Sequence, residues 1–189
     1  MKKVYISCYE NSDYLYKDIL VKSNEMRGNK LFQLIESNPD WIEKDYLTKK
    51  ENIIPFIKKS ILKTADVVLF LIGNETKKRR VVDWEVRAAM TKYGIFEKCG
   101  IVVVYLPELI EKYGTKIPRT VLPNILKDNI DKSDVFMVET TWDKIKRDIN
   151  ILDKLFNTAY AYSKMSKYDL DSTPIELENV NNYPANSFK

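Results

Sequence analysis

The sequence predicts an α/β fold in which a five-stranded parallel sheet lies between two layers of helices. Short apolar, β-branched segments alternate about five times with segments of helical periodicity, as expected for strands joined by crossover helices. Two of these segments, 66–73 (DVVLFLIG) and 100–106 (GIVVVYL), are continuously apolar, as are parallel strands that are covered on both faces. The 189 residues suffice for one domain with a substantial core.

The first half of the chain supplies three strands and two helices. We expect a strand at 3–8 (KVYISC) and then a helix over 11–26, which Ser12 can cap and which turns Leu15, Ile19 and Lys22 or Ser23 inward. Residues 29–37 are ambiguous and are the candidate second strand, and 38–50 look like a long loop. A helix at 51–65, with Pro55 in its first turn, leads into the strand at 66–73.

The second half repeats this alternation. A helix that ends at Gly94 precedes the strand at 100–106. A loop-rich stretch with Pro107, Pro118 and Pro123, which can hold a short helix, leads to a last strand at 134–139 (DVFMVE). One long amphipathic helix is predicted over 142–165, with an inner side made of Ile145, Ile149, Leu152, Leu155 and Phe156. We therefore expect a domain over residues 1–166 and an extended tail over 167–189.

For five such strands the common order is 2-1-3-4-5, the flavodoxin-like arrangement. Ligands of these sheets bind outside the carboxyl ends of the strands where the order reverses, which is between strands 1 and 3. The polar stretches SCYENSD (7–13) and GNETKKRR (73–80) follow those two strands, so they are the expected binding region.

Composition excludes several classes of site. Histidine is absent, which removes Ser-His and Cys-His nucleophile pairs and the usual imidazole metal ligands, so no metal is expected. Two cysteines are too few for a disulfide scaffold, and a reducing cytoplasm is the expected location. A net charge of +4 is too small to indicate nucleic acid, and no apolar stretch approaches the roughly 20 residues of a membrane helix.

The segment 77–94 (KKRRVVDWEVRAAMTKYG) contains a carboxylate, Glu85, beside its apolar stripe. At about 100° per residue, Glu85 lies roughly 85° from the centre of that stripe, on a flank shared with Val81, Trp84 and Ala88. An apolar wall that holds one carboxylate is typical of a functional site, but a glutamate in the second turn of a helix is also a common surface residue. The residues of the stripe are Val82, Val86, Ala89, Met90 and Tyr93.

Four consecutive cations, Lys77 to Arg80, precede this helix. They form either a solvated basic run or an electropositive mouth suited to a pyrophosphate, with Thr76 as a cap or a phosphate ligand. The sequence has neither a GxGxxG motif nor a Walker A motif, so neither a Rossmann dehydrogenase nor a P-loop enzyme is supported.

These stretches together resemble the TIR-like domain family and, within it, the TIR-like subunit of the bacterial Thoeris anti-phage system. The pattern of that family is V-[FY]-I-S-[FY] followed by Asp, then L-I-G-x-x-T, an Arg-containing turn, and W/Y-E in the second helical turn. The resemblance spans roughly Lys3 to Val104. It departs at Cys8 and Val81, where the family often has aromatic residues. The matching residues are Val4, Tyr5, Ile6, Ser7, Asp13, Leu71, Ile72, Gly73, Thr76, Arg79 or Arg80, Trp84 and Glu85.

The resemblance implies a TIR-like fold and an enzyme that cleaves NAD, releases nicotinamide and forms a cyclic ADP-ribose isomer. Glu85 would be the catalytic glutamate, and NAD would be a substrate, with no cofactor required. The nucleotide product would activate a partner effector protein, and self-association is a further expectation, while no membrane or nucleic acid partner is expected. The residues expected to bind the substrate are Ser7, Cys8, Tyr9, Asp13, Gly73, Thr76, Arg79, Arg80, Val81 and Trp84.

Two other classes of function stay open. The first is a non-catalytic TIR-like adaptor that associates through an exposed Trp84 flank and a tyrosine-rich surface. The second is a receptor or nucleotide-binding module on the same architecture, or a deoxyribosyltransferase-like enzyme that uses a glutamate at an anomeric carbon. Fold alone does not separate these from an NAD-cleaving enzyme.

Overall fold

The computed structural model describes residues 1–9, 12–36 and 53–167, and in them five parallel strands form one sheet of order β2-β1-β3-β4-β5. The flavodoxin-like architecture and strand order predicted from the sequence are thereby confirmed. The strands are β1 (Lys3–Ser7), β2 (Gln33–Ile35), β3 (Val67–Ile72), β4 (Gly100–Tyr105) and β5 (Val138–Thr141).

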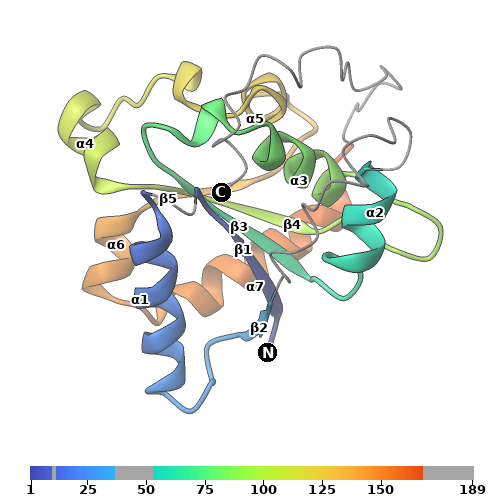
Figure 1. The fold of residues 1–189 in the computed structure, drawn as a ribbon, viewed down its shortest axis with the longest axis horizontal. Helices are drawn as coiled ribbons and strands as arrows, with labels where there is room; N and C mark the ends of the chain where they lie inside the picture. Colours follow the sequence, from blue (N-terminus) through green and yellow to red (C-terminus); the bar gives the residue numbers. More distant parts are fainter. Residues whose placement is uncertain (10–11, 37–52, 168–189) are drawn as a thin grey trace.

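Helices cover both faces of the sheet (Figure 1). One face carries α1 (Tyr14–Glu25), α6 (Trp142–Arg147) and α7 (Ile151–Met165). The opposite face carries α2 (Ile53–Ser60), α3 (Arg80–Met90) and α5 (Asn124–Asn129). Shorter elements lie at the carboxyl edge of the sheet, namely α4 (Pro107–Tyr113) after β4 and the 3-10 turns η2 (Thr76–Lys78) and η3 (Arg119–Val121).

The two central strands form the middle of the core. Every residue of β3 and β4 is buried, because each strand is flanked by neighbours in the sheet and by helices above and below. Gly100 allows close packing at the start of β4: a Cβ there would overlap the backbone of Ala159 in α7. The continuously apolar sequences of these two strands thus reflect burial on both faces.

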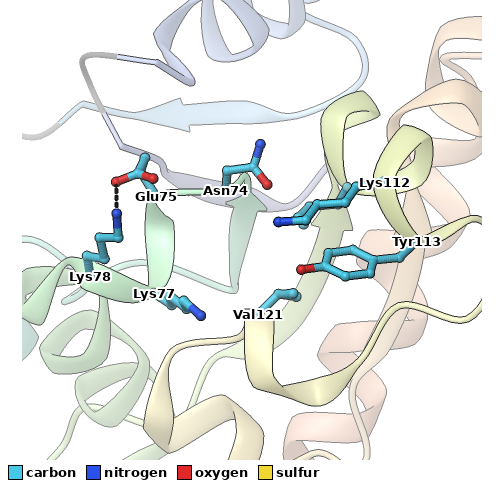
Figure 2. Close-up of a pocket in the computed structure, with 8 residues that line it drawn as sticks. Asn74, Glu75, Lys77, Lys78, Lys112, Tyr113 and Val121 are labelled. Carbon is cyan, nitrogen blue, oxygen red and sulfur yellow. Dashed lines mark hydrogen bonds and ion pairs between the residues drawn. The ribbon is translucent and has the colours of Figure 1, made fainter.

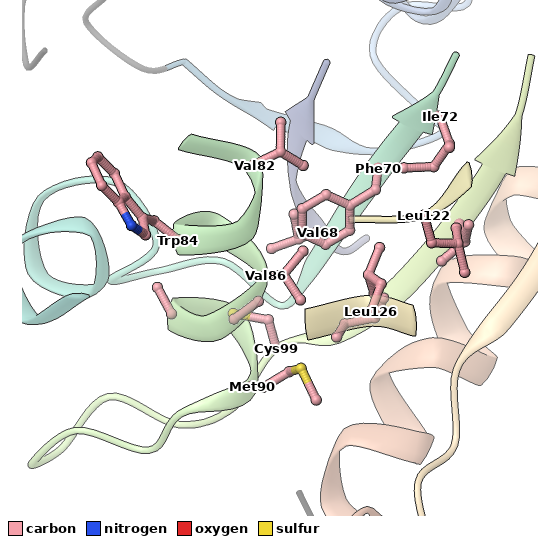
Figure 3. Packing of buried hydrophobic residues seen from close by; sticks show 14 of the residues in the cluster. Val68, Phe70, Ile72, Val82, Trp84, Val86, Met90, Cys99, Leu122 and Leu126 are labelled. Atoms are coloured by element: carbon pink, nitrogen blue, oxygen red, sulfur yellow. The ribbon is translucent and has the colours of Figure 1, made fainter. Parts of the chain in front are cut away.

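Helix α3 packs its apolar stripe on the sheet, as predicted. Val82, Val86, Ala89 and Met90 are buried, and Figure 3 shows Val86 and Met90 on the side of α3 that faces Leu126. The prediction fails at the end of the stripe, since Tyr93 is exposed.

Helix α3 ends at Met90 and not at Gly94. The hydroxyl of Thr91 donates a 2.7 Å hydrogen bond to the carbonyl of Arg87, and Thr91 itself is extended, with φ −91° and ψ 134°. The chain then turns back, because the backbones of Tyr93 and Phe96 exchange two hydrogen bonds of 2.9 Å. Gly94, with φ +57°, serves this turn and does not cap the helix.

The inner side of α1 also differs from the prediction. Leu15 and Ile19 are exposed, and Leu20 and Asn24 are buried in their place. The Asn24 side chain accepts the Leu31 N–H at 3.0 Å and donates to the Phe32 carbonyl at 2.9 Å, which fixes the rotation of the helix. The N-cap residue of α1 is Asp13, and not Ser12 as predicted. The Asp13 side chain makes no capping hydrogen bond.

The last strand begins four residues later than predicted and ends two residues later. The carbonyl of Asp134 accepts the Lys167 N–H at 2.8 Å, and the Phe136 N–H donates to the Ser166 hydroxyl at 3.0 Å. These bonds tie the predicted start of the strand to the end of α7. Pairing with β4 therefore begins only at Val138.

The helix predicted over 142–165 is two helices, α6 and α7. Asp148 is extended, with φ −147° and ψ 97°, and its carboxylate accepts the Asn150 N–H at 3.0 Å. Such a local bond between a side chain and the backbone competes with helical hydrogen bonding, so the helix is interrupted at Asp148.

The whole of the predicted loop at 38–50, and all of the predicted tail at 167–189 except its first residue, fall outside the described residues. None of the helices in the described ranges is long and apolar enough to cross a membrane.

Candidate active site at the carboxyl edge of the sheet

The carboxylate of Glu85 is held at the carboxyl end of β1 by two hydroxyl groups. Tyr5 and Ser7 are two residues apart in a strand, so their side chains point to the same face of the sheet. That face is covered by α3, and the Tyr5 hydroxyl donates to Glu85 Oε1 at 2.6 Å. The Ser7 hydroxyl donates to Glu85 Oε2 at 2.5 Å. Each carboxylate oxygen therefore has its own donor, which fixes the plane of the group.

Glu85 is buried, with 4% of its surface exposed. It lies deeper than the flank position that helical spacing predicts, because the hydroxyls of β1 draw the carboxylate toward the sheet. Hydrogen bonds of this kind offset the cost of burying a carboxylate. A carboxylate oxygen has acceptor capacity for more than one donor.

A second set of hydrogen bonds joins the ends of β1 and β3. The Thr76 hydroxyl accepts the Gly73 N–H at 2.8 Å and donates to Asp13 Oδ2 at 3.0 Å. The Ser12 hydroxyl donates to Asp13 Oδ1 at 2.5 Å. Burial raises the pKa of the Asp13 carboxyl, against the opposing effect of the hydroxyls of Ser12 and Thr76. The sequence-predicted residues Asp13, Gly73 and Thr76 are therefore brought together at the switch point.

The absence of a side chain at Gly73 lets two carboxyl groups approach the end of β3. A Cβ at this position would lie 2.6 Å from Glu108 Oε1 and 2.8 Å from Asp13 Oδ1, so alanine does not fit without displacement. Burial raises the pKa of the Glu108 carboxyl, and the nearby charge of Asp13 raises it further. Sequence reasoning missed Glu108, which no motif signals and which only the β4–α4 connection brings to this place.

The two arginines of the basic run Lys77 to Arg80 have different surroundings in the structure. The Arg79 guanidinium lies over the Tyr9 ring at 3.6 Å from its centroid, a cation–π contact between the two segments that follow β1 and β3. Arg80 is the first residue of α3. Val81 is half-buried against the core on the α3 side, and Cys8 is half-buried and packs against the opposite core.

The prediction that Trp84 lies on an accessible flank is wrong. Its side chain is 3% exposed and belongs to the hydrophobic core on this face. In Figure 3 the ring projects from α3 on the side away from Leu122 and Leu126, toward α2. Helices α2 and α3 pack directly together, which covers a ring that helical spacing places beside the main stripe.

Tyr5 is a site residue to which the sequence reading gave no role. Its spacing from Ser7 in a strand was the available signal, since both side chains must point to one face. No three Cys, Asp or Glu side chains of the described residues form a group that could hold a metal ion.

Comparison with known proteins places the chain in a family. A family model described as "Thoeris protein ThsB, TIR-like domain" matches residues 5–111, more than half of the chain. This range includes the last three residues of β1 and all of β3 and α3, and hence Tyr5, Ser7 and Glu85. No curated protein and no solved structure gives a significant match. The chain belongs to the family of Thoeris ThsB TIR-like domains, which are proteins of a defence system.

Proposed function

We propose that this chain is an NAD-cleaving signalling enzyme of bacterial anti-phage defence, with Glu85 as its catalytic carboxylate. One observation carries the proposal: a buried glutamate is oriented by two hydroxyls at the end of β1, in a chain of the TIR-like family. The carboxyl edge beside a topological switch point is where sheets of this order bind ligands.

The proposed reaction breaks the bond between C1′ of the ribose and the nicotinamide nitrogen. Nicotinamide leaves with the bonding electron pair as a neutral molecule, so little acid catalysis is needed. The ribose carbon then resembles an oxocarbenium ion, as in glycoside cleavage. A nucleophilic atom elsewhere in the same ADP-ribose attacks C1′ and loses its proton. The products are nicotinamide, a cyclic ADP-ribose isomer and H⁺. Attack by water would give linear ADP-ribose.

Glu85 stabilises the developing positive charge in this scheme, either directly or through the ribose hydroxyls. A fixed carboxylate in a water-poor site does this better than one that must reorient. Tyr5 and Ser7 act as positioning residues, because each holds one oxygen of Glu85. No step requires a metal ion or a cofactor.

The adaptor alternative loses one of its supports. It relied on an exposed Trp84 flank as an association surface, and Trp84 is buried in the core. Association with another protein does not require the two hydrogen bonds that orient Glu85. A catalytic carboxylate does require such bonds, because it must be held in one position.

The proposal is tested by the nucleotide products of infected cells. Cells that express the wild-type chain, Glu85→Gln or Glu97→Gln are infected with phage, and their extracts are resolved by mass. Glu97 is an exposed residue paired with Lys92, so Glu97→Gln controls for the chemical change alone. We expect nicotinamide and a cyclic ADP-ribose mass with wild type and Glu97→Gln, and neither with Glu85→Gln. Equal products from Glu85→Gln would overturn the assignment.

A further inference from the structure

A pocket of about 330 Å³ opens at the carboxyl edge of the sheet (Figure 2). Glu85 is bound to β1, on one side of β3, whereas the pocket lies between the turn after β3 and the segments that follow β4. Its volume is at the low end of the range for small-molecule sites, which begins at about 300 Å³. It is lined by Asn74, Glu75, Lys77, Lys78, Leu109, Lys112, Tyr113 and Val121.

The pocket has an excess of positive charge. Three lysines line it against one carboxylate, and that carboxylate, Glu75, is already bound to Lys78 at 2.6 Å. The Lys77 amino group donates to the backbone carbonyl of Thr120 at 3.4 Å. Among the described residues, neither Lys77 nor Lys112 has a carboxylate within ion-pair distance. Two ammonium groups are therefore available to an anion from outside.

These cations converge on one space. Figure 2 shows the amino group of Lys112 and the hydroxyl of Tyr113 pointing into the space that Lys77 borders from the other side, with Asn74 above them. Leu109 and Val121 are buried and form an apolar base. A pocket that combines two cations, neutral donors and an apolar base suits a phosphate group attached to an organic body.

The sequence run Lys77 to Arg80 explains how the pocket acquires its charge. The 3-10 turn η2 directs the first two lysines to the β4 side of β3, while Arg79 contacts Tyr9 on the β1 side. Lys112 comes from the last turn of α4. Lys77 and Lys112, which have no carboxylate partner among the described residues, thus come from positions 35 apart in the sequence.

We propose that this pocket binds the phosphate group of a small phosphorylated molecule, mononucleotide in size. The site is separate from the Glu85 centre and does not depend on NAD cleavage. Lys77 and Lys112 bind the phosphate oxygens, and Tyr113 and Asn74 add neutral hydrogen bonds. The apolar base and the Tyr113 ring contact the organic part. The same phosphate chemistry would accept either a nucleotide or free inorganic pyrophosphate.

Calorimetric titration of the full chain with AMP, inorganic pyrophosphate and adenosine tests this site. The variants are Lys77→Gln and Lys112→Gln, with Lys59→Gln as the control, because Lys59 is an exposed lysine of α2 outside the pocket. We expect saturable binding of AMP or pyrophosphate and none of adenosine. Loss of one charge-assisted contact should weaken binding by about tenfold or more in each pocket variant, with no change in Lys59→Gln.

The arms of the titration distinguish the two sources of phosphate. Tighter binding of AMP than of pyrophosphate assigns the pocket to a nucleotide, and the reverse assigns it to the free anion. Glu85→Gln should bind as wild type does, so this result is independent of whether NAD is cleaved. Absence of saturable binding, or equal affinities in Lys77→Gln, Lys112→Gln and Lys59→Gln, would overturn the proposal. Thermal unfolding of each variant verifies that the fold is intact.

Discussion

The hydroxyl of Ser7 donates a hydrogen bond of 2.5 Å to one carboxylate oxygen of Glu85, across 78 positions of sequence. This bond joins the end of β1 to the second turn of α3. A hydrogen bond to a charged acceptor contributes about 1.5–3 kcal/mol. In the proposed reaction that bond keeps the carboxylate in place for the ribose.

Ser7→Ala should lower the kcat for nicotinamide release by about ten- to a hundredfold and leave KM nearly unchanged, because the carboxylate remains but is less well oriented. Ser163→Ala is the matched control: Ser163 is equally buried, in α7, and donates to the Tyr160 carbonyl at 2.8 Å. Steady-state kinetics on both variants measures the effect. An unchanged kcat in Ser7→Ala would remove the positioning role.

Thr76→Val should destabilise the chain by about 2–4 kcal/mol, because it leaves both the Gly73 N–H and the Asp13 carboxyl without the Thr76 hydroxyl. Valine has nearly the shape of threonine, so packing changes little. Thr76→Ser keeps the hydroxyl and should restore most of the loss. Denaturant unfolding compares the three proteins, and a valine variant as stable as wild type would show that these bonds contribute nothing net.

Asp83→Asn should stabilise the chain near neutral pH. Burial raises the pKa of Asp83 to about 6, and its carboxylate accepts the Ile125 N–H at 3.1 Å, at the start of α5. A raised pKa means that the folded state holds the proton more tightly than the unfolded state, whose value is 3.8. The contribution of Asp83 to the unfolding free energy is therefore fully present below about pH 4, and it is lost as the pH rises through about 6.

Asparagine keeps the accepting oxygen without the charge. We expect Asp83→Asn to exceed wild type in unfolding free energy by about 1–3 kcal/mol at neutral pH, with the gain vanishing below about pH 4. Asp153→Asn, on the exposed side of α7, should show no such pH dependence. A difference in unfolding free energy between Asp83→Asn and wild type that stays constant from below pH 4 to neutral pH would contradict this prediction.

Lys58→Met should also raise stability. Lys58 is fully buried, with its amino group 3.6 Å from the Cys99 sulfur, and burial lowers its pKa. The unfolded state then binds the proton more tightly, so wild-type stability increases as the pH rises through the folded pKa toward 10.5. We expect a gain of about 1–3 kcal/mol at neutral pH that shrinks in alkali.

Lys59→Met provides the control for Lys58→Met, since Lys59 is exposed on the same helix. Thermal and denaturant unfolding at neutral and alkaline pH measures both variants. A loss of stability in Lys58→Met would indicate that the contact with Cys99 outweighs the cost of burying the amine.

The central strands were predictable because their signal is local. The runs at β3 and β4 are apolar throughout, and only a strand buried on both faces tolerates this. Alternation of strands and helices then leaves few topologies, and the observed order is the common one. Helix faces and ends were less predictable. Leu15 and Ile19 have the right spacing, but the bonds of Asn24 to Leu31 and Phe32 decide which side of α1 is buried.

The site was predictable only in part. Helical spacing placed Glu85 beside the core, but its burial depends on Tyr5 and Ser7, about 80 residues away in the chain. Trp84 carries no sequence signal that α2 will cover it. Glu108 and Lys112 reach the carboxyl edge through α4, in a stretch that the sequence predicts to be loop-rich, with a short helix at no stated position. Contacts between distant segments decide these features, so local patterns do not contain them.

The most direct test of the account is the rate of nicotinamide release from NAD by the purified chain in clarified extract of phage-infected cells. Wild type, Glu85→Gln and the exposed control Glu97→Gln are compared at equal concentration. The account predicts release by wild type and Glu97→Gln, and a loss of at least about a hundredfold in Glu85→Gln, as for removal of a main electrostatic contact to a transition state. Release by Glu85→Gln at the wild-type rate, or by none of the three, would contradict it.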